Sequence, residues 1–243
     1  MSRIAVVTGA ASGIGAATAR RLAEEGAELW LVDRAAEQVG QLAVSLDANC
    51  VVADVTEPGA AERVLDQAGG LDVLVTAAGA ILRRTAEETS DADWEAALAL
   101  NLTATFRFCR AAVPVMRARG GGAIVTVGSG WGLVAGPRAV AYAATKAAVV
   151  NLTRALAIDH GRDGIRANCV CPGDTDTPLL HDELAQLGED AAAGIAASGA
   201  VRPLGRIALP TDIAAAIAWL ASADARHVTG TTLVVDGGGL AGG

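Results

Sequence analysis

Short runs of aliphatic and β-branched residues alternate with amphipathic segments along the whole chain. In the segment 13–25, for example, Ile14, Ala17 and Leu22 fall on one helical face, and Gly26 follows as a helix C-cap would. The apolar runs predict strands at 4–7, 29–32, 50–53, 72–76, 123–127, 166–170 and 232–235. The amphipathic spacing predicts helices at 13–25, 93–116, 141–160 and 211–221.

This alternation predicts a parallel sheet with helices on both faces, because the crossovers between parallel strands must pack on the sheet. It continues to the end of the chain without a linker. We therefore expect one α/β domain over residues 1–243, with a single Rossmann-type, doubly wound sheet. A polar segment from 174 to about 206 interrupts the alternation. Trp94 and Trp219, at helical spacing among alanines and leucines, are expected in the core.

Composition and charge exclude several classes of partner. The formal net charge is -8, which argues against a nucleic acid or an anionic membrane as partner, since either favours a basic face. The apolar stretch 4–7 follows the first three residues directly and leaves no room for a signal peptide. The longest uncharged stretch, 120–137, is interrupted by glycines. We expect a cytoplasmic protein that binds neither nucleic acid nor membrane.

The cysteines and histidines do not form a metal motif. Their spacing matches no metal clamp, so we expect no metal and free, mostly buried thiols in a reducing compartment. The residues concerned are Cys50, Cys109, Cys169, Cys171, His160, His181 and His227.

A glycine-rich turn separates the first predicted strand from the first predicted helix. Residues 8–15 read Thr-Gly-Ala-Ala-Ser-Gly-Ile-Gly, which lets backbone amides and a helix N-terminus approach a pyrophosphate. The second strand ends at Asp33, eighteen residues after Gly15, close to the spacing of an acid that binds an adenosine ribose. A carboxylate there repels a 2′-phosphate and selects NAD, whereas Arg34 could hold that phosphate. Asp33 is the stronger influence, so we expect NAD and keep NADP as the alternative.

The single tyrosine and the single lysine of the chain stand four residues apart. Tyr142 and Lys146 therefore share a face of the predicted helix. An ammonium beside a phenol favours the phenolate and lowers the tyrosine pKa, which suits a general acid/base. The other basic residues are eighteen arginines, so this one lysine points to chemistry that a guanidinium cannot perform.

Taken in order, these motifs resemble the short-chain dehydrogenases/reductases in their short single-domain form, over essentially the whole chain. Residues 8–15 resemble the TGxxxGIG motif of that family, and the Tyr142/Lys146 pair resembles its YxxxK motif. Ser129 stands thirteen residues before Tyr142, at the spacing of the family serine. Further matching positions are Asp54 and Val55, Asn101, Pro172 and Gly173, Thr177, and the terminal stretches 228–230 and 236–238.

The resemblance implies a role for each matching residue. Tyr142 would be the general acid/base, Ser129 would fix the substrate oxygen, and Lys146 would bind the nicotinamide ribose and lower the tyrosine pKa. Asn101 would anchor a water in the proton path, and Trp131 could form a wall of the substrate pocket. The implied cofactor-binding set is Gly9, Ser12, Gly13, Ile14, Gly15, Asp33, Arg34, Asp54, Val55, Ala77, Ala78, Gly79, Tyr142, Lys146, Pro172, Gly173, Thr175 and Thr177.

The chain departs from the family pattern at two places. Residues 76–79 are Thr-Ala-Ala-Gly where the family has an Asn-rich turn, so an amide that braces the sheet is missing. The backbone contact to the cofactor should survive. Thr175 occupies a place often held by Ile or Val, and we expect little effect because that contact is made by the backbone.

The substrate is expected to lie under the variable segment 179–206, acting as a lid. The expected reaction is NAD-dependent interconversion of a neutral secondary alcohol and a ketone, the alcohol being a polyol, a cyclic alcohol or a diol. One alternative is an NADPH-dependent reductase of 3-oxoacyl thioesters on a carrier protein, which would need a basic docking patch; Arg83, Arg84 and Arg138 are the candidates. Another is a nucleotide-binding regulatory protein without turnover. The resemblance also implies a homodimer or homotetramer.

Overall fold

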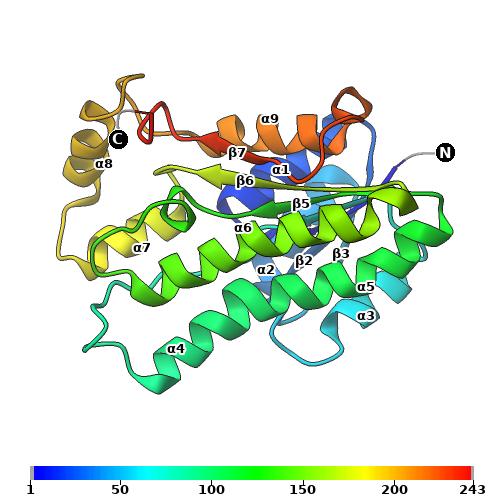
Figure 1. Cartoon of the computed structure of the whole chain (residues 1–243), viewed down its shortest axis with the longest axis horizontal. Coiled ribbons are helices and arrows are strands. Elements are labelled where there is room, and N and C mark those ends of the chain that lie inside the picture. Colours follow the sequence, from blue (N-terminus) through cyan, green and yellow to red (C-terminus); the bar gives the residue numbers. More distant parts are fainter. Residues whose placement is uncertain (1–2, 242–243) are drawn as a thin grey trace.

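The computed structural model describes residues 3–241, which form one parallel sheet with helices on both faces (Figure 1). The strand order is β3-β2-β1-β4-β5-β6-β7, and every neighbouring pair is parallel. The strands are β1 (Ile4–Thr8), β2 (Glu28–Asp33), β3 (Asn49–Val52), β4 (Val73–Thr76), β5 (Gly122–Val127), β6 (Ile165–Pro172) and β7 (Thr232–Val235). The predicted doubly wound α/β sheet is confirmed.

The α-helices are α1 (Gly13–Glu24), α2 (Ala36–Leu46), α3 (Ala60–Ala68), α4 (Asp91–Ala97), α5 (Ala104–Ala118), α6 (Val140–His160), α7 (Pro178–Gln186), α8 (Ala191–Ala200) and α9 (Pro210–Ala221). Of the described part of the chain, α2 and α3 are helices that the amphipathic spacing did not predict. Both are short, at 11 and 9 residues, so their apolar repeat is sampled for only about two or three turns. No helix among residues 3–241 is long and apolar enough to cross a membrane.

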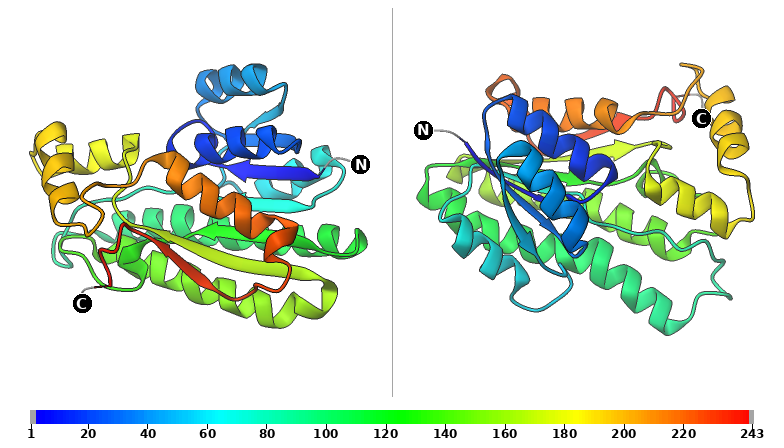
Figure 2. Two further views of the ribbon diagram at one scale, coloured as in Figure 1. Left: turned by 90° about the horizontal axis from the view of Figure 1, so that it is seen from above. Right: turned by 180° about the vertical axis from the view of Figure 1, so that it is seen from behind.

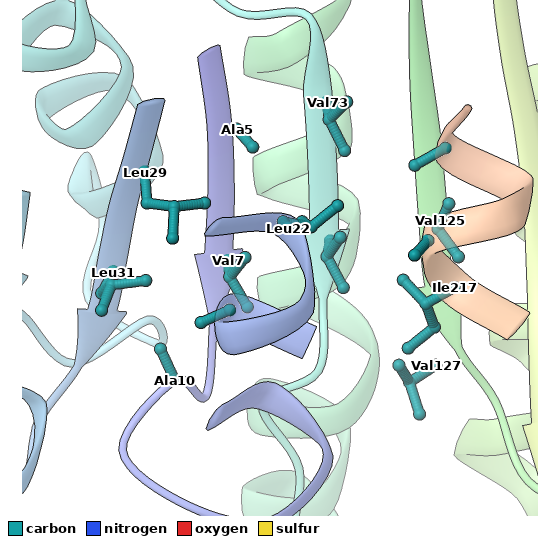
Figure 3. Close-up of a cluster of buried hydrophobic side chains, with 14 of the residues drawn as sticks. Ala5, Val7, Ala10, Leu22, Leu29, Leu31, Val73, Val125, Val127 and Ile217 are labelled. Carbon is teal, nitrogen blue, oxygen red and sulfur yellow. The ribbon is translucent and has the colours of Figure 1, made fainter. Parts of the chain in front are cut away.

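Alternation along the strands divides the core into two layers. Val7 on β1 packs with α1 and α9 on one face, whereas Val6 faces α3, α5 and α6 on the other. The first layer is visible in Figure 3, where Leu22 of α1 lies over β1 and Ile217 of α9 lies beside β5. In Figure 1 α5 and α6 lie in front of the sheet, and the rear view in Figure 2 shows α1 and α2. Both faces are therefore covered, as strands with an apolar residue at nearly every position require.

The strand order reverses between β1 and β4, which are neighbours although β2 and β3 lie between them in sequence. At such a switch point the loops leaving the two strands diverge to opposite faces and leave a crevice at the carboxyl end of the sheet. The loops after β1, β4, β5 and β6 all open at this edge. Figure 1 shows α7 and α8 at the same end of the molecule.

Helices α4 and α5 form one continuous helical segment with a π-helical turn, η1 (Leu98–Thr103), between them. This segment includes the predicted helix 93–116. Asn101 lies in the π turn and is 1% exposed. A π turn shifts the register of the backbone hydrogen bonds and is common at functional sites.

The polar segment after Asp174 contains two helices rather than irregular structure. Thr177 caps α7 through the Leu180 N–H at 3.3 Å, with Pro178 at the first helical position, and Asp190 caps α8 through the Ala193 N–H at 2.9 Å. The alanine content of α8 then favours the helical state.

The expectation that Trp94 and Trp219 lie in the core is wrong, since they are 36% and 44% exposed. On α9 the buried stripe includes Ile213, Ile217 and Leu220, and Trp219 lies beside that stripe rather than in it. Helix α4 has no buried residue at all. Helical spacing identified the right elements but assigned these two side chains to the wrong face.

Candidate active site

The glycine-rich turn after β1 is packed so closely that side chains do not fit. Gly9 has φ 68°, and a Cβ there would lie 2.7 Å from the Ala78 nitrogen. A Cβ on Gly15 would overlap the carbonyl oxygen of Gly9. Gly13 also has positive φ, and Ser12 stands at the N-cap of α1. The turn therefore presents backbone amides and a helix N-terminus to the crevice, which is the arrangement that fits a pyrophosphate.

Asp33 ends β2 beside this turn. Its carboxylate accepts hydrogen bonds from the Ala11 N–H at 3.1 Å and the Ala35 N–H at 3.0 Å. Arg34 is exposed. Its charge helps to lower the pKa of Asp54, although the larger causes are the hydrogen bonds that Asp54 accepts from Thr56. Backbone amides thus hold the Asp33 carboxylate, whereas the charge of Arg34 acts on another carboxylate, that of Asp54.

The turn after β4 lies against the glycine turn. The Ala77 N–H donates to the Thr8 carbonyl at 3.3 Å, and the Ala78 N–H donates to the Thr8 hydroxyl at 3.4 Å. Ala78 and the buried Val55 line a narrow gap that has no room for a water molecule.

The loop after β6 closes the nucleotide side of the cleft. The Thr175 hydroxyl donates to the Gly173 carbonyl at 3.0 Å, and the Thr177 hydroxyl donates to the Thr175 carbonyl at 3.1 Å. A Cβ on Gly13 would lie 3.2 Å from the Thr177 side chain, so this loop packs on the glycine turn. Pro172 is the last residue of β6 and lines the cleft.

Ser129, Tyr142 and Lys146 are brought together at the centre of the cleft. Ser129 follows β5, and its hydroxyl accepts the Trp131 N–H at 3.1 Å. Tyr142 and Lys146 lie one turn apart near the start of α6. The Lys146 ammonium donates to the Val127 carbonyl at 2.9 Å and lies 5.7 Å from the centre of the Tyr142 ring. A phenol, a hydroxyl and an ammonium therefore converge on one space.

The pKa values of the two titratable groups differ from the expectation. Burial raises the pKa of Tyr142 to about 12, although the Ser129 hydroxyl lowers it, and the charge of Glu183 raises it further. Burial lowers the pKa of Lys146 to about 8. The protein alone thus favours the neutral phenol, because burial removes the hydration that would stabilise a phenolate. The prediction that the pKa of Tyr142 is lowered is therefore wrong for the protein without a ligand. A further positive charge in the cleft would lower this pKa.

Asn101 lies behind these residues. Its amide oxygen accepts the Ala80 N–H at 2.9 Å, and its nitrogen donates to the Ala80 carbonyl at 3.0 Å and to the Thr145 hydroxyl at 3.3 Å. A Cβ on Gly79 would lie 3.1 Å from the Asn101 oxygen and 3.4 Å from the Lys146 nitrogen. Asn101 therefore joins the turn after β4 to α6 next to the lysine.

The cleft has about 920 Å³ of empty space, its open mouth included. The predicted residues that line it are Ile14, Ala77, Gly79, Ser129, Trp131, Tyr142, Lys146, Pro172, Gly173, Thr175 and Thr177. The remaining predicted residues do not line it; they lie in the glycine turn, at the end of β2, in the segment 54–55, in the turn after β4 and in the π turn.

The sequence predicted that the substrate lies under the segment 179–206, but it assigned no role to single residues of that segment on the substrate side of the cleft. Asp174, Glu183, Arg202, Asp236 and Leu240 line it. Glu183 pairs with Arg83, 100 positions away, so no motif spacing could have identified that pair. Asp236, by contrast, accepts hydrogen bonds from the nearby Gly238 and Leu240 amides.

The proposed basic docking patch is not formed. Arg83 pairs with Glu183, Arg84 with Asp93 at 2.7 Å, and Arg138 with Glu88 at 3.1 Å. Each guanidinium is thus neutralised by an acid of this chain.

The thiols are free, as expected. Cys109, Cys169 and Cys171 are buried, whereas Cys50 is exposed. Within residues 3–241, no group of three His, Cys, Asp or Glu side chains could hold a metal ion.

Comparison with known proteins agrees with this site. A family model described as enoyl-(acyl carrier protein) reductase matches residues 9–239. The cis-4-hydroxycyclohexanecarboxylate dehydrogenase of Sinomonas cyclohexanicum is 44% identical, over 97% of this chain and 96% of that protein. The D-threitol dehydrogenase of Mycolicibacterium smegmatis is 40% identical, over 97% of this chain and 92% of that protein. The crystal structure of levodione reductase superposes with a TM-score of 0.93 at 32% identity, over 97% of this chain and 96% of that chain.

The chain belongs to the short-chain dehydrogenase/reductase family. It is an oxidoreductase that acts on CH–OH groups with a nicotinamide cofactor. The resemblance inferred from the motifs is confirmed.

Proposed function

We propose that the protein oxidises a neutral secondary alcohol to a ketone, with NAD as its cofactor and Tyr142 as the general base. The observation that carries this proposal is the convergence of Ser129, Tyr142 and Lys146 in a cleft beside the glycine turn. The same constellation would serve the reverse reduction, with Tyr142 as the acid.

In this proposal each side chain has one task. The Ser129 hydroxyl holds the substrate oxygen near the phenol, and the Tyr142 oxygen takes the hydroxyl proton. Lys146 stabilises the phenolate by its charge and binds the nicotinamide ribose, and Asn101 holds the turn after β4 and anchors a water that carries the proton onward. A bound oxidised nicotinamide supplies the hydride acceptor and a positive charge that favours the phenolate.

NAD is favoured over NADP by the end of β2. The Asp33 carboxylate ends β2 beside the glycine turn, and a carboxylate at the end of this strand would accept hydrogen bonds from the adenosine ribose and repel a 2′-phosphate. Arg34 is the one feature that favours the phosphate, and the neighbouring Asp54 offsets its charge.

A neutral substrate is favoured by the lining of the cleft and by two of the matched relatives, although the relative at 44% identity is named for a hydroxycyclohexanecarboxylate. Asp174, Glu183 and Asp236 line the substrate side, which opposes an anion. Matched relatives include dehydrogenases of D-threitol and of meso-2,3-butanediol, the latter from Serratia marcescens at 37% identity. We infer a diol, polyol or cyclic alcohol as the substrate.

The carrier-protein alternative has less support, because the three arginines that could dock a carrier are paired with acids. The test is formation of NADH at 340 nm with a panel of alcohols, each assayed with NAD and with NADP. Oxidation of several alcohols with NAD supports the proposal. Reduction of 3-oxoacyl thioesters with NADPH alone would replace it with the carrier-protein reaction, and tight NAD binding without any turnover would replace it with a regulatory role.

We propose that α7 and α8, within the segment 179–206, act as a lid over the substrate. Arg202 joins this segment to Asp174 at 2.8 Å, and the Leu204 N–H donates to the Gly237 carbonyl at 3.2 Å. Limited proteolysis with and without NAD tests this, since a lid should become more resistant when the cleft is filled.

We further propose a cytoplasmic homodimer or homotetramer. β7 is an edge strand of the sheet, and Trp219 on the adjacent α9 is 44% exposed, while Ile158 on α6 is 81% exposed. Light scattering of the wild type and of Trp219→Arg tests this: a smaller assembly in the variant supports an interface through α9 and β7.

A further inference from the structure

The substrate side of the cleft contains a carboxylate that is largely buried, that of Glu183. Glu183 lies on α7, where the other lining residues are Leu179 and Leu180. Its side chain is 14% exposed, and burial raises its pKa. A carboxylate in such a place persists only with charged or hydrogen-bonding partners.

Arg83 is the partner that balances this charge. Its side chain is 7% exposed, and its guanidinium pairs with Glu183 and lies 4.8 Å from the centre of the Trp131 ring. The Arg83 N–H donates to the Gln186 side chain at 2.9 Å, and that side chain donates to the Ile81 carbonyl at 3.2 Å. Glu183 and Trp131 are thus fixed relative to each other and to the turn after β4.

Only one oxygen of Glu183 is engaged. Oε1 accepts the hydrogen bond from Arg83, and no hydrogen bond from residues 3–241 reaches Oε2. Glu183 lines the cleft and its charge raises the pKa of Tyr142, so it acts on the space where the phenol lies. A partly desolvated acceptor there gains free energy when a ligand donates to it.

We propose that Glu183 determines specificity by accepting a hydrogen bond from a second hydroxyl group of the substrate. The enzyme then prefers diols and polyols to simple alcohols and rejects alcohols that carry a carboxylate. This inference rests on the proposed alcohol oxidation. A site built to bind a hydroxyl discriminates strongly against an analogue without it.

The charges around the cleft agree with rejection of a carboxylate. Asp174 and Asp236 line the same side as Glu183. Arg202 also lines it, but its guanidinium already donates to the Asp174 carboxylate at 2.8 Å. A substrate carboxylate would have to compete with that pair while lying near Glu183.

Matched pairs of substrates test the proposal. The first pair is meso-2,3-butanediol and 2-butanol, which differ by one hydroxyl group. The second is cis-1,4-cyclohexanediol and cis-4-hydroxycyclohexanecarboxylate. With NAD we expect kcat/KM to be at least about tenfold higher for the diol in each pair. In the first pair 2-butanol lacks the second hydroxyl donor, and in the second pair a carboxylate replaces that donor and is repelled by Glu183.

Variants then assign the preference to Glu183. Glu183→Leu should bring the 2,3-butanediol to 2-butanol ratio of kcat/KM close to one, mainly through the diol. The same substitution is combined with Arg83→Met, so that no buried cation is left without its partner. Glu183→Gln, which has nearly the same shape, provides a third variant and should lower the ratio at least threefold. Asp182→Asn, at an exposed acid of the same helix, is the control and should keep the wild-type ratio.

The outcomes separate this inference from the proposed function. Loss of the diol preference in the folded Glu183 variants, but not in the control, supports the role of Glu183. A wild-type ratio near one, or a wild-type ratio retained by the Glu183 variants, overturns this inference and leaves alcohol oxidation in place. Failure of the wild type to oxidise any alcohol of the panel overturns both.

Discussion

The two sides of the cleft are built by different means. On the nucleotide side, backbone lies against backbone, and Gly9 and Gly15 have no room for a side chain. On the substrate side, large side chains define the surface, namely Trp131 and the pair Arg83 and Glu183. A surface made of backbone fits one shape of ligand, whereas one made of side chains can change its specificity by substitution without a change of fold.

The largest effect is expected where the two sides meet, at the phenol. Tyr142→Phe removes the proton acceptor and should lower kcat/KM for alcohol oxidation by about a thousandfold. Affinity for NAD should change little, because the glycine turn is intact. Steady-state kinetics and calorimetric titration with NAD measure the two quantities. Activity within tenfold of the wild type would show that another group moves the proton.

The next prediction tests the rigidity of the nucleotide side. Gly15→Ala places a Cβ against the Gly9 carbonyl and should weaken NAD binding by roughly a hundredfold, since the turn must open. Gly40→Ala is the matched control: nothing lies within 4 Å of its Cβ on α2, and it should stabilise the fold by about 1 kcal/mol. Equal NAD affinity of the two variants would contradict a close-packed turn.

Lys146 lies between the two sides, and its burial predicts a dependence of stability on pH. Its pKa falls from 10.5 to about 8, so the unfolded chain binds more protons between these values and the free energy of unfolding rises with pH across that window. Relative to Lys146→Met, the wild type should gain about 2 kcal/mol between roughly pH 7 and pH 9.5. Urea denaturation at the two pH values measures this. Parallel pH dependence in both proteins would refute a lowered lysine pKa.

Cofactor choice should depend on one carboxylate of the nucleotide side. Asp33→Asn loses the charge and keeps one of the two oxygens that accept the Ala11 and Ala35 amides, so one of these hydrogen bonds is lost as well. The ratio of kcat/KM with NAD to that with NADP should fall about tenfold. Asp47→Asn, at an exposed residue with φ 50° that asparagine tolerates, is the control. An unchanged ratio in Asp33→Asn would remove Asp33 as the selector.

The smallest effect on stability and activity is expected at Arg84, next to Arg83, where a large effect on stability is expected. Arg84→Gln disturbs a pair whose side chains are 43% and 26% exposed, so stability should change by less than about 1 kcal/mol and kcat/KM by less than twofold. Arg83→Gln breaks a buried pair and should lower the melting temperature clearly. Equal effects at both positions would mean that burial does not distinguish the two pairs.

Local spacing brought the glycine turn and the central residues together and pointed to the segment 179–206, but it could not pair the side chains of the substrate side. The glycine turn, Asp33, Ser129 and the Tyr142 pair occur at strand ends or on one helix, so local spacing places them. The pair between Arg83 and Glu183 joins residues 100 positions apart, and no local pattern encodes it. Likewise, the surroundings of a buried lysine, and hence its pKa, depend on the packing of the whole fold.

The π turn around Asn101 has a consequence for how this chain can vary in length. It adds one residue to the repeat of a helix that runs from α4 through α5. Deleting a residue within it would restore the α repeat and rotate everything on its N-terminal side by about 100° relative to α5. Asn101 could then no longer hold the Ala80 backbone while contacting Thr145. The hydrogen bonds of this one amide therefore tie the length of the helix to the positions of Ala80 and Thr145.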